Sequence, residues 1–310
     1  MDIIDLHCDT LTEIEKRGCG VGDPALMITP EKAAPFDRYV QVGAIWSHYS
    51  LSDEQAWERF DRVVDLYKSL DGAFPVCLPP EALQKKRAVI LAVEGARLLA
   101  GDISRLDHLY ERGVRIMTLC WKGTDCIGGS WDTDEGLTAF GREVVERCFE
   151  LGIVPDVSHA SRKVTAEVIA AARERGKTAI ASHSNSYALC AHGRNITDGE
   201  FRDIAALGGV VGISMFPPHL AGDRADIGDV LRHIEHYFSL GGEKVVVLGC
   251  DLDGIGPNPD DIADISDLPK LYDAIAGRFG EDAAKRVFSE NAREFLVRIF
   301  GKASADPESK

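Results

Sequence analysis

Imidazole and carboxylate side chains stand at the end of the first apolar segment of this 310-residue chain, where His7 and Asp9 are two residues apart. In a β-strand, residues i and i+2 project from the same face, so these two groups would lie side by side. A borderline cation such as zinc accepts an imidazole and a carboxylate as ligands. A single His-x-Asp pair is common by chance, so the prediction of a metal site depends on matching groups elsewhere.

Four more such groups follow apolar segments later in the chain. Taken singly, a buried histidine is usually a hydrogen-bonded core residue, and a carboxylate after a strand usually caps a helix. Six polar groups at five strand ends, however, would be costly to bury without a shared partner, and a metal centre supplies one. We therefore predict metal ligands at five positions and a catalytic carboxylate beside them: His7, Asp9, Glu94, His159 and His183, with Asp251.

This number of groups suits two cations bridged by one carboxylate. Glu94 can contact both cations through its two oxygens, with His7 and Asp9 on one side and the two later histidines on the other. A water shared by two cations loses a proton near neutral pH and becomes a nucleophile. Asp251 is expected to accept that proton and pass it to the leaving group. Asp253 is the alternative; Asp251 is preferred because it comes first, and Asp253-Gly254 is typical of a turn.

The elements that must position these groups are eight apolar segments, most of them separated by helical patterns. Nearly continuous apolar strands are typical of parallel sheets covered by helices, and eight β/α units favour a TIM (β/α)8 barrel with C-terminal helices. A doubly wound open sheet is the rival, but no G-x-G-x-x-G follows the first strand. The strands are expected at 1–10, 39–46, 88–94, 114–120, 153–158, 178–183, 209–215 and 244–251. One helix is expected to begin at the N-cap Ser52. Further helices are expected at 104–112, 138–151, 161–175, 198–207 and 225–240, and within 267–300.

Composition narrows the functional classes. The net charge of −15 argues against a nucleic-acid partner, which would require a basic surface. The N-terminus lacks the pattern of a secretory signal, and no apolar run is long enough to span a membrane, so no membrane anchor is expected. Eight scattered cysteines without a C-x-x-C pair favour a reduced, cytoplasmic location. One domain is expected over 1–310, with a polar tail from about 302.

The motifs around these residues resemble the membrane (renal) dipeptidase family, peptidase M19, among the amidohydrolase-type metal-dependent hydrolases. They are 5–10 (Asp-Leu-His-Cys-Asp-Thr), 93–95 (Val-Glu-Gly), 156–159 (Asp-Val-Ser-His), 182–184 (Ser-His-Ser) and 249–254 (Gly-Cys-Asp-Leu-Asp-Gly). The resemblance extends through 115–119 and 136–141 to 291–293 and so covers nearly the whole chain. It implies two Zn²⁺ ions bridged by Glu94 and hydrolysis of L,L or L,D dipeptides. The alternatives are a related hydrolase of N-acyl amino acids, lactams or cyclic amides, and a catalytically silent binding protein.

The resemblance also assigns substrate-binding residues. The stretch 187–195 is similar to the family segment whose arginine holds the dipeptide's C-terminal carboxylate, which implies that role for Arg194. Trp121 stands where mammalian-type members carry a histidine thought to polarise the scissile carbonyl. Either Trp121 donates its N–H there, or His192 or Lys122 substitutes, or the activity differs. Lys122 is also near the position of the carboxylated lysine that bridges the metals in some related barrels, but Glu94 is the preferred bridge. Because members of the family are often dimers, the resemblance implies that this protein forms a homodimer.

Overall fold

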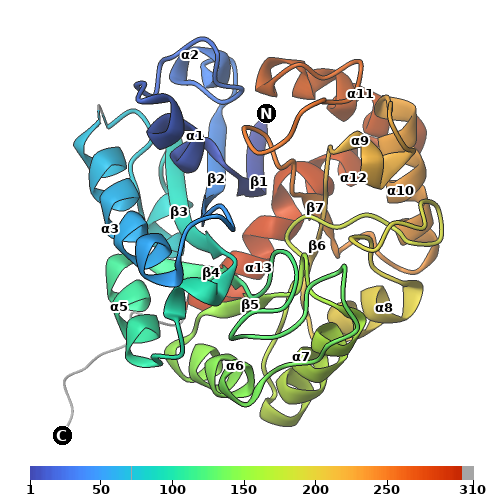
Figure 1. Ribbon diagram of the computed structural model, residues 1–310. Helices are drawn as coiled ribbons and strands as arrows, with labels where there is room; N and C mark the ends of the chain where they lie inside the picture. Colours follow the sequence, from blue (N-terminus) through green and yellow to red (C-terminus); the bar gives the residue numbers. More distant parts are fainter. Residues whose placement is uncertain (71, 302–310) are drawn as a thin grey trace, which may run out of the picture.

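The computed structural model describes residues 1–70 and 72–301, and its strands form one parallel sheet that curls around a central axis (Figure 1). The order of the strands is β5-β4-β3-β2-β1-β7-β6. All pairings are parallel. The bounds are β1 Asp2–Cys8, β2 Arg38–Trp46, β3 Arg87–Glu94, β4 Val114–Thr118, β5 Val154–Asp156, β6 Val211–Ile213 and β7 Val246–Leu248.

The ring is closed by residues 178–183, which were predicted as a full strand but form only isolated parallel bridges. Ile180 pairs with Asp156 of β5, and Ala181 pairs with Val211 of β6. A regular ladder is interrupted here because Pro155 has no N–H to donate and because the N–H of Ser182 donates to the Asp156 side chain. The segment still occupies the place of an eighth strand, and the predicted TIM-like barrel is confirmed.

Helices surround this ring on its outer side (Figure 1). Most of the predicted helices are present within one or two residues of their expected bounds, and Ser52 forms the capping box of α3 with Gln55. Helix α1 and two short helices that begin with proline, α4 and α9, were not predicted. The bounds are α1 Thr10–Arg17, α2 Pro30–Ala33, α3 Asp53–Ser69, α4 Pro79–Ala82, α5 Ser104–Arg112, α6 Ala139–Leu151, α7 Arg162–Arg175, α8 Asp198–Ala206, α9 Pro217–Leu220, α10 Ile227–Ser239, α11 Leu268–Phe279, α12 Glu281–Lys285 and α13 Asn291–Phe300, with 3₁₀ turns at Ala96–Leu99 and Ile265–Asp267 and a π-helical turn at Arg286–Glu290.

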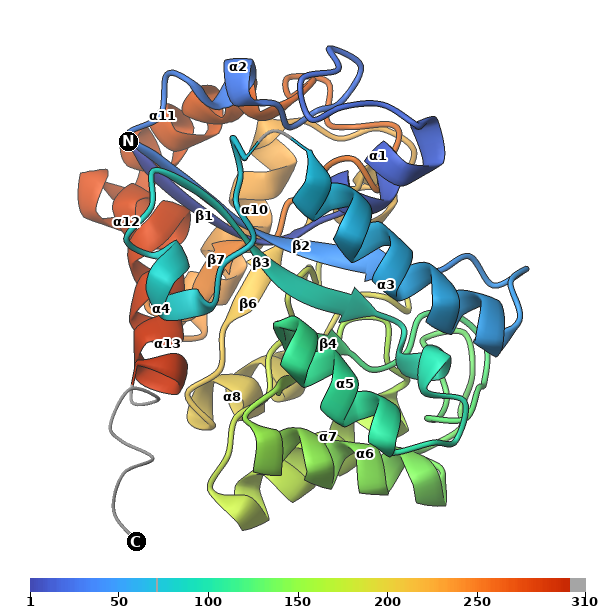
Figure 2. The same ribbon diagram turned by 90° about the vertical axis from the view of Figure 1, so that its left-hand side faces the viewer.

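The interior of the barrel is a separate apolar core made by alternate strand residues. Val40 and Val42 of β2 and Ile90 and Ala92 of β3 belong to it, as expected from the two-residue period of a strand. The helix α13 contributes Phe295, Leu296 and Phe300 to the same core. Figure 2 shows α13 at the end where the strands begin. This end is therefore filled, and the opposite end, where the strands finish, is left for a site.

Strand β1 contains an irregularity that changes which residues face inward. Asp5 pairs with Gln41, yet Cys8 pairs with Gly43, so three steps on β1 match two steps on β2. Leu6 lies in the inner core, whereas Cys8 packs in the outer core with the helices. Such a bulge shifts the alternation by one residue. His7 consequently faces the centre, and the strand ends before Asp9, which precedes α1. The prediction that both residues stand on one uninterrupted strand is wrong in this detail.

None of the helices in the described ranges is long and apolar enough to cross a membrane. The single-domain assignment for 1–310 stays a prediction, and the predicted polar tail from 302 lies outside the described residues.

Candidate active site

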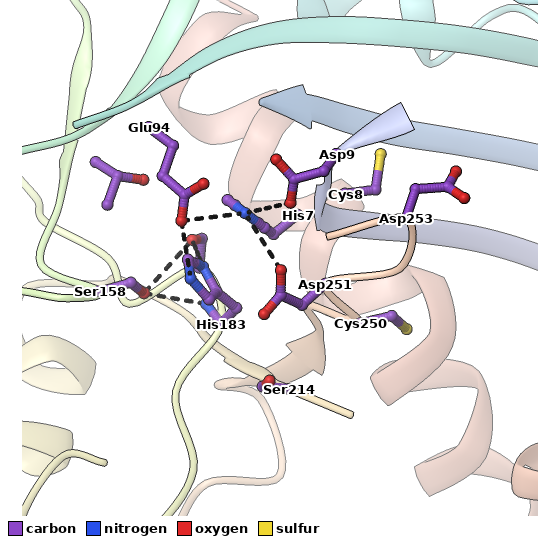
Figure 3. A network of polar contacts seen from close by, with 12 residues as sticks. His7, Cys8, Asp9, Glu94, Ser158, His183, Ser214, Cys250, Asp251 and Asp253 are labelled. Atoms are coloured by element: carbon purple, nitrogen blue, oxygen red, sulfur yellow. Dashed lines mark hydrogen bonds and ion pairs between the residues drawn. The ribbon is translucent and has the colours of Figure 1, made fainter. Parts of the chain in front are cut away.

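The six polar groups predicted from the sequence meet at the carboxyl ends of the strands. Figure 3 shows five of them: His7, Asp9, Glu94, His183 and Asp251. His7 is at the centre of one half of the cluster. Its Nε2 atom is 3.6 Å from Asp9 Oδ2, 3.7 Å from Glu94 Oε1 and 3.8 Å from Asp251 Oδ1. His7, Asp9 and Asp251 therefore form one group of possible metal ligands, and His7, Glu94 and His183 form another.

His159 and His183 make the other half of the cluster together with Glu94. His159 Nε2 is 2.8 Å from Glu94 Oε1 and 2.9 Å from His183 Nε2. His183 Nε2 is 3.5 Å from the same glutamate oxygen. Glu94 thus contacts both halves of the cluster, which is the position expected of a bridging carboxylate.

The orientation of His183 is set by two residues that the sequence motifs contained but to which no role was given. The hydroxyl of Ser182 donates to Asp156 Oδ2 at 2.6 Å, and Ser182 Oγ lies 2.7 Å from His183 Nδ1. Because the only hydroxyl proton is used toward Asp156, Nδ1 of His183 must carry the proton of that second bond. The lone pair of His183 is therefore on Nε2, which faces Glu94 and His159.

His159 is oriented in the same way by the backbone. Its Nδ1 lies 3.1 Å from the carbonyl oxygen of Trp121, which can only accept a hydrogen bond. Nδ1–H is therefore the donor, and Nε2 presents a lone pair to the cluster. Hydrogen bonds of this kind on the distal nitrogen are how proteins orient histidines that bind metals.

The electrostatics of the cluster favour a bound cation. Burial lowers the pKa of His159 and of His183 well below the usual value, so both imidazoles are neutral. Burial also lowers the pKa of His7, but Glu94, Asp9 and Asp251 outweigh it and raise this pKa to about 10. The three carboxylates thus stabilise a positive charge on His7, the one basic group among them.

The residues present fit a metal centre by a second, geometric criterion. His159 Nε2, His183 Nε2 and Glu94 Oε1 are three acceptors that lie 2.8 to 3.5 Å apart. His7 Nε2 is buried and has no hydrogen-bond partner among the described residues. Facing acceptors repel one another and are costly to bury unless a cation neutralises them. Imidazoles and carboxylates are a donor set that zinc and similar divalent ions accept.

The local backbone is shaped to hold these groups. His159 and Asp251 both have positive φ angles, 68° and 65°, a conformation that costs a non-glycine residue on the order of 1 kcal/mol. Gly254 lies directly against the carboxylates: a Cβ atom there would be 2.1 Å from Asp9 Oδ2 and 3.0 Å from Asp251 Oδ1. The turn after β7 therefore needs glycine for this close approach.

A cavity of about 390 Å³ opens directly over the cluster and is lined by Asp9, Glu94, His159 and Asp251. Arg194, to which the resemblance assigns the substrate carboxylate, lies in the wall of this cavity and is only 5% exposed. Neither of its terminal nitrogens has a hydrogen-bond partner among the described residues. Burial lowers the pKa of Arg194 to about 10, so the guanidinium remains charged at neutral pH. A buried, unpaired cation of this kind is suited to a ligand carboxylate.

The other residues considered from the sequence fall into different places. Asp253 accepts hydrogen bonds from Thr10 Oγ1 at 2.7 Å and from the backbone N–H of Met27 at 2.6 Å, so both of its oxygens serve the loop structure. Lys122 is exposed at the rim of the cavity, and its Nζ is 5.5 Å from the centre of the Tyr49 ring.

Trp121 lines the cavity, with its ring 5.9 Å from that of His159. His192 is half-buried, packs beside Trp131, and its Nδ1 accepts from the backbone N–H of Arg194 at 3.2 Å. The structure thus brings Trp121 to the cluster and leaves His192 in contact with the arginine loop.

A TIM-like barrel that gathers imidazoles and carboxylates beneath a cavity at its carboxyl end is the architecture of a metal-dependent hydrolase. Residues 1–307 match the family described as membrane dipeptidase, peptidase family M19, and the chain belongs to that family of metallo-dipeptidase hydrolases. The predicted family is confirmed.

Similar proteins agree with this assignment. An uncharacterized protein from the pqqA 5′ region of Klebsiella pneumoniae is 31% identical over an alignment of 237 residues, and the match covers 71% of this chain and 86% of that protein. An uncharacterized dipeptidase of Schizosaccharomyces pombe is 31% identical over an alignment of 204 residues, and the match covers 62% of this chain and 48% of that protein.

Two solved structures of high similarity extend over almost the whole chain. The dipeptidase AC, a metallopeptidase of family M19, has a TM-score of 0.89 at 26% identity, with 97% of this chain and 99% of that chain covered. A metallopeptidase from Rhodobacter sphaeroides, solved with a phosphinate mimic of the dipeptide L-Ala-D-Ala, has a TM-score of 0.87 at 25% identity with the same coverage.

Proposed function

We propose that this protein is a zinc-dependent dipeptidase that hydrolyses the peptide bond of L,L or L,D dipeptides. The observation that supports this most is the shared cavity, which joins a cluster of metal-binding groups to the buried, unpaired guanidinium of Arg194. Metal ions in the cluster would polarise the carbonyl of the scissile amide, and the guanidinium of Arg194 would bind a free carboxylate. A dipeptide carries an amide carbonyl and a free carboxylate at this kind of spacing, one on each side of its C-terminal residue. The dipeptide mimic bound by the Rhodobacter relative supports the same substrate class.

The two zinc ions would be held by His7, Asp9 and Glu94 on one side and by Glu94, His159 and His183 on the other. When bound, they would supply a water of lowered pKa and polarise the scissile carbonyl. Arg194 would bind the substrate's carboxylate through its planar pair of N–H groups and so restrict the enzyme to short peptides. The carboxylate of Asp251 would take the proton of the attacking water and deliver it to the departing amine.

Asp251 is favoured over Asp253 for the proton transfer because its carboxylate is the one that faces the cluster. Burial raises the pKa of Asp251 well above its usual value, the direction expected of a group that must hold a proton during turnover. For Trp121 we propose substrate contact rather than chemistry, because an indole N–H donates but does not titrate in this range.

Substrate and metal can be tested together on the purified protein reconstituted with zinc. L-Ala-L-Ala and L-Ala-D-Ala should be cleaved at least about tenfold faster, in kcat/KM, than N-acetylalanine of either configuration, and about two zinc ions per chain should be retained. Faster cleavage of the N-acyl substrates or of a cyclic amide would instead support the related amidohydrolase-type activity. Metal retention below about one ion per chain would contradict a binuclear centre and favour a binding protein.

Asp251→Asn separates chemistry from metal binding. The amide keeps the shape of the side chain but cannot accept the proton, so we expect zinc to be retained while kcat falls by about 10² or more. Near-normal kcat in this variant would remove Asp251 from the mechanism.

The cellular location and the assembly are also proposed. All eight cysteines are in the described ranges and none is in a disulfide, which supports a reduced compartment, and we propose the cytoplasm. A homodimer is proposed from the family resemblance alone. Cell fractionation and light scattering would test these two statements.

A further inference from the structure

Aromatic side chains form one wall of the cavity on the side away from Arg194. Trp46 is the last residue of β2, and the alternation that places Val40 and Val42 in the inner core also turns Trp46 inward. Trp121 follows β4. The two rings are 4.9 Å apart and tilted by 51°, and both line the cavity. Side chains from two separate strand ends thus build one apolar surface.

This surface is in contact with the metal-binding cluster at one edge and open to solvent at the other. At the inner edge, the Trp121 ring is stacked on that of His159 at 5.9 Å. At the outer edge, the ring of Tyr49 lies 6.0 Å from Trp121 at an angle of 19°, and Tyr49 is 57% exposed. A substrate side chain that extends from the reacting carbonyl in this direction would contact aromatic rings along its length.

The order of the strands determines which end of a substrate reaches this wall. Counted around the ring as β1, β2, β3, β4, β5, 178–183, β6 and β7, the segment 178–183 is four places from β2 in either direction. Arg194 is on the loop that follows 178–183, so it is opposite Trp46. Glu94, at the end of β3, lies between the strands that carry the two tryptophans. A dipeptide anchored at Arg194 therefore crosses the cluster and places its N-terminal residue against the aromatic wall.

We propose that Trp46 and Trp121 form the subsite for the N-terminal residue of the dipeptide and that this subsite selects a large aromatic side chain. The proposal rests on the proposed function, because it assumes that Arg194 holds the carboxylate. Aromatic rings prefer tilted or offset neighbours 4.5 to about 7 Å away, and such pairs stabilise a complex by more than apolar burial alone. The cavity of about 390 Å³ that both tryptophans line can take a third ring beside them.

The test compares dipeptides that share one C-terminal residue, the better of L-Ala and D-Ala, and differ at the first position. With zinc bound, Phe-Ala should exceed Gly-Ala by at least about tenfold in kcat/KM, a difference of about 1.4 kcal/mol. Trp46→Leu should reduce this ratio by about fivefold or more, since leucine fills part of the volume but cannot stack. Thermal unfolding of the variant checks that it is folded.

Trp131 provides the matched control. It lines the same cavity but lies on the side of the arginine loop, 5.1 Å from the ring of His192 and against Gly193. Trp131→Leu should alter kcat/KM for Phe-Ala and Gly-Ala by the same factor and leave their ratio unchanged. Loss of the ratio in Trp131→Leu but not in Trp46→Leu would overturn the assignment of the two ends.

Binding to the zinc-loaded Asp251→Asn protein distinguishes failure of this inference from failure of the proposed function. Calorimetry should show Phe-Ala binding at least about tenfold more tightly than Gly-Ala, and Trp46→Leu in the same background should abolish most of the difference. If the wild type cleaves no dipeptide but this binding preference is present, the dipeptidase assignment fails and the subsite stands. If Phe-Ala binds no more tightly than Gly-Ala, the aromatic subsite is wrong whatever the turnover.

Discussion

Replacing Ser182 by alanine tests whether the orientation of His183 is what makes it a metal ligand. Ser182 Oγ is the acceptor for His183 Nδ1–H at 2.7 Å and at the same time donates to Asp156 Oδ2 at 2.6 Å. Alanine removes both bonds and leaves His183, which is fully buried, free to choose the other tautomer or to rotate. The lone pair would then no longer be held toward Glu94.

The size of the effect can be set from these two bonds. Loss of the partner on the distal nitrogen of a metal-binding histidine weakens metal affinity by about 10- to 100-fold. This factor equals about 1.4 to 2.7 kcal/mol of binding free energy. A further loss of stability of about 1 kcal/mol is expected because Asp156, also fully buried, loses one hydroxyl donor.

The assay is a competition titration of zinc against a chelator, with thermal unfolding of the metal-free protein measured in parallel. Thr118→Val is the matched control, since the Thr118 hydroxyl donates to the same Asp156 Oδ2 and, within the described residues, forms no hydrogen bond to His183. Both variants should lose similar stability as metal-free proteins, whereas only Ser182→Ala should lose zinc affinity. Equal zinc affinity in the two variants would refute the argument that Ser182 acts through the tautomer of His183.

Four further results are expected. Arg194→Met should lower kcat/KM for a dipeptide by about 10- to 100-fold through loss of a charged hydrogen bond, but should affect the corresponding dipeptide amide far less, and equal losses would exclude the carboxylate clamp. Gly254→Ala should reduce zinc affinity and activity because the added methyl would overlap Asp9 Oδ2, as measured by metal titration; unchanged affinity would show that the turn can move. Removal of metal by a chelator should lower the thermal midpoint in a way that zinc reverses, because binding stabilises only the folded state. His233 accepts a hydrogen bond from the N–H of Ser186, and burial lowers the pKa of His233. Its contribution to the free energy of unfolding is therefore complete above about pH 6.5 and is lost as the pH falls further. The free energy of urea unfolding should consequently decline less for His233→Gln than for the wild type between about pH 7 and about pH 5.

The sequence by itself determined the barrel and the identity of the polar cluster. Continuous apolar segments ending in His7, Glu94, His183 and Asp251 are a one-dimensional signal, because parallel strands bring all their carboxyl ends to one side. The period of two was also sufficient to turn Glu94 inward, since Ile90 and Ala92 precede it on the same face of β3. The N-cap at Ser52 was likewise legible from the local pattern.

What only the tertiary structure decided are contacts between segments that are distant in the chain. The bulge in β1 depends on pairing with β2, so the sequence predicted the right neighbours, His7 and Asp9, from a strand geometry that is not the one present. Asp253 was the alternative to Asp251 by spacing, and only the structure shows that Thr10 and the N–H of Met27 donate to its oxygens. Burial of Arg194 also arises only from loops that meet in three dimensions.

Trp121 shows the same division between sequence and structure most clearly. The motif identified it as a replacement for a histidine and left only its N–H to consider. The structure places its ring between Trp46 and His159, and its carbonyl oxygen orients His159 through Nδ1. A backbone carbonyl carries no residue identity, and a ring stack depends on the curvature of the sheet, so neither contact could be read from the order of the amino acids.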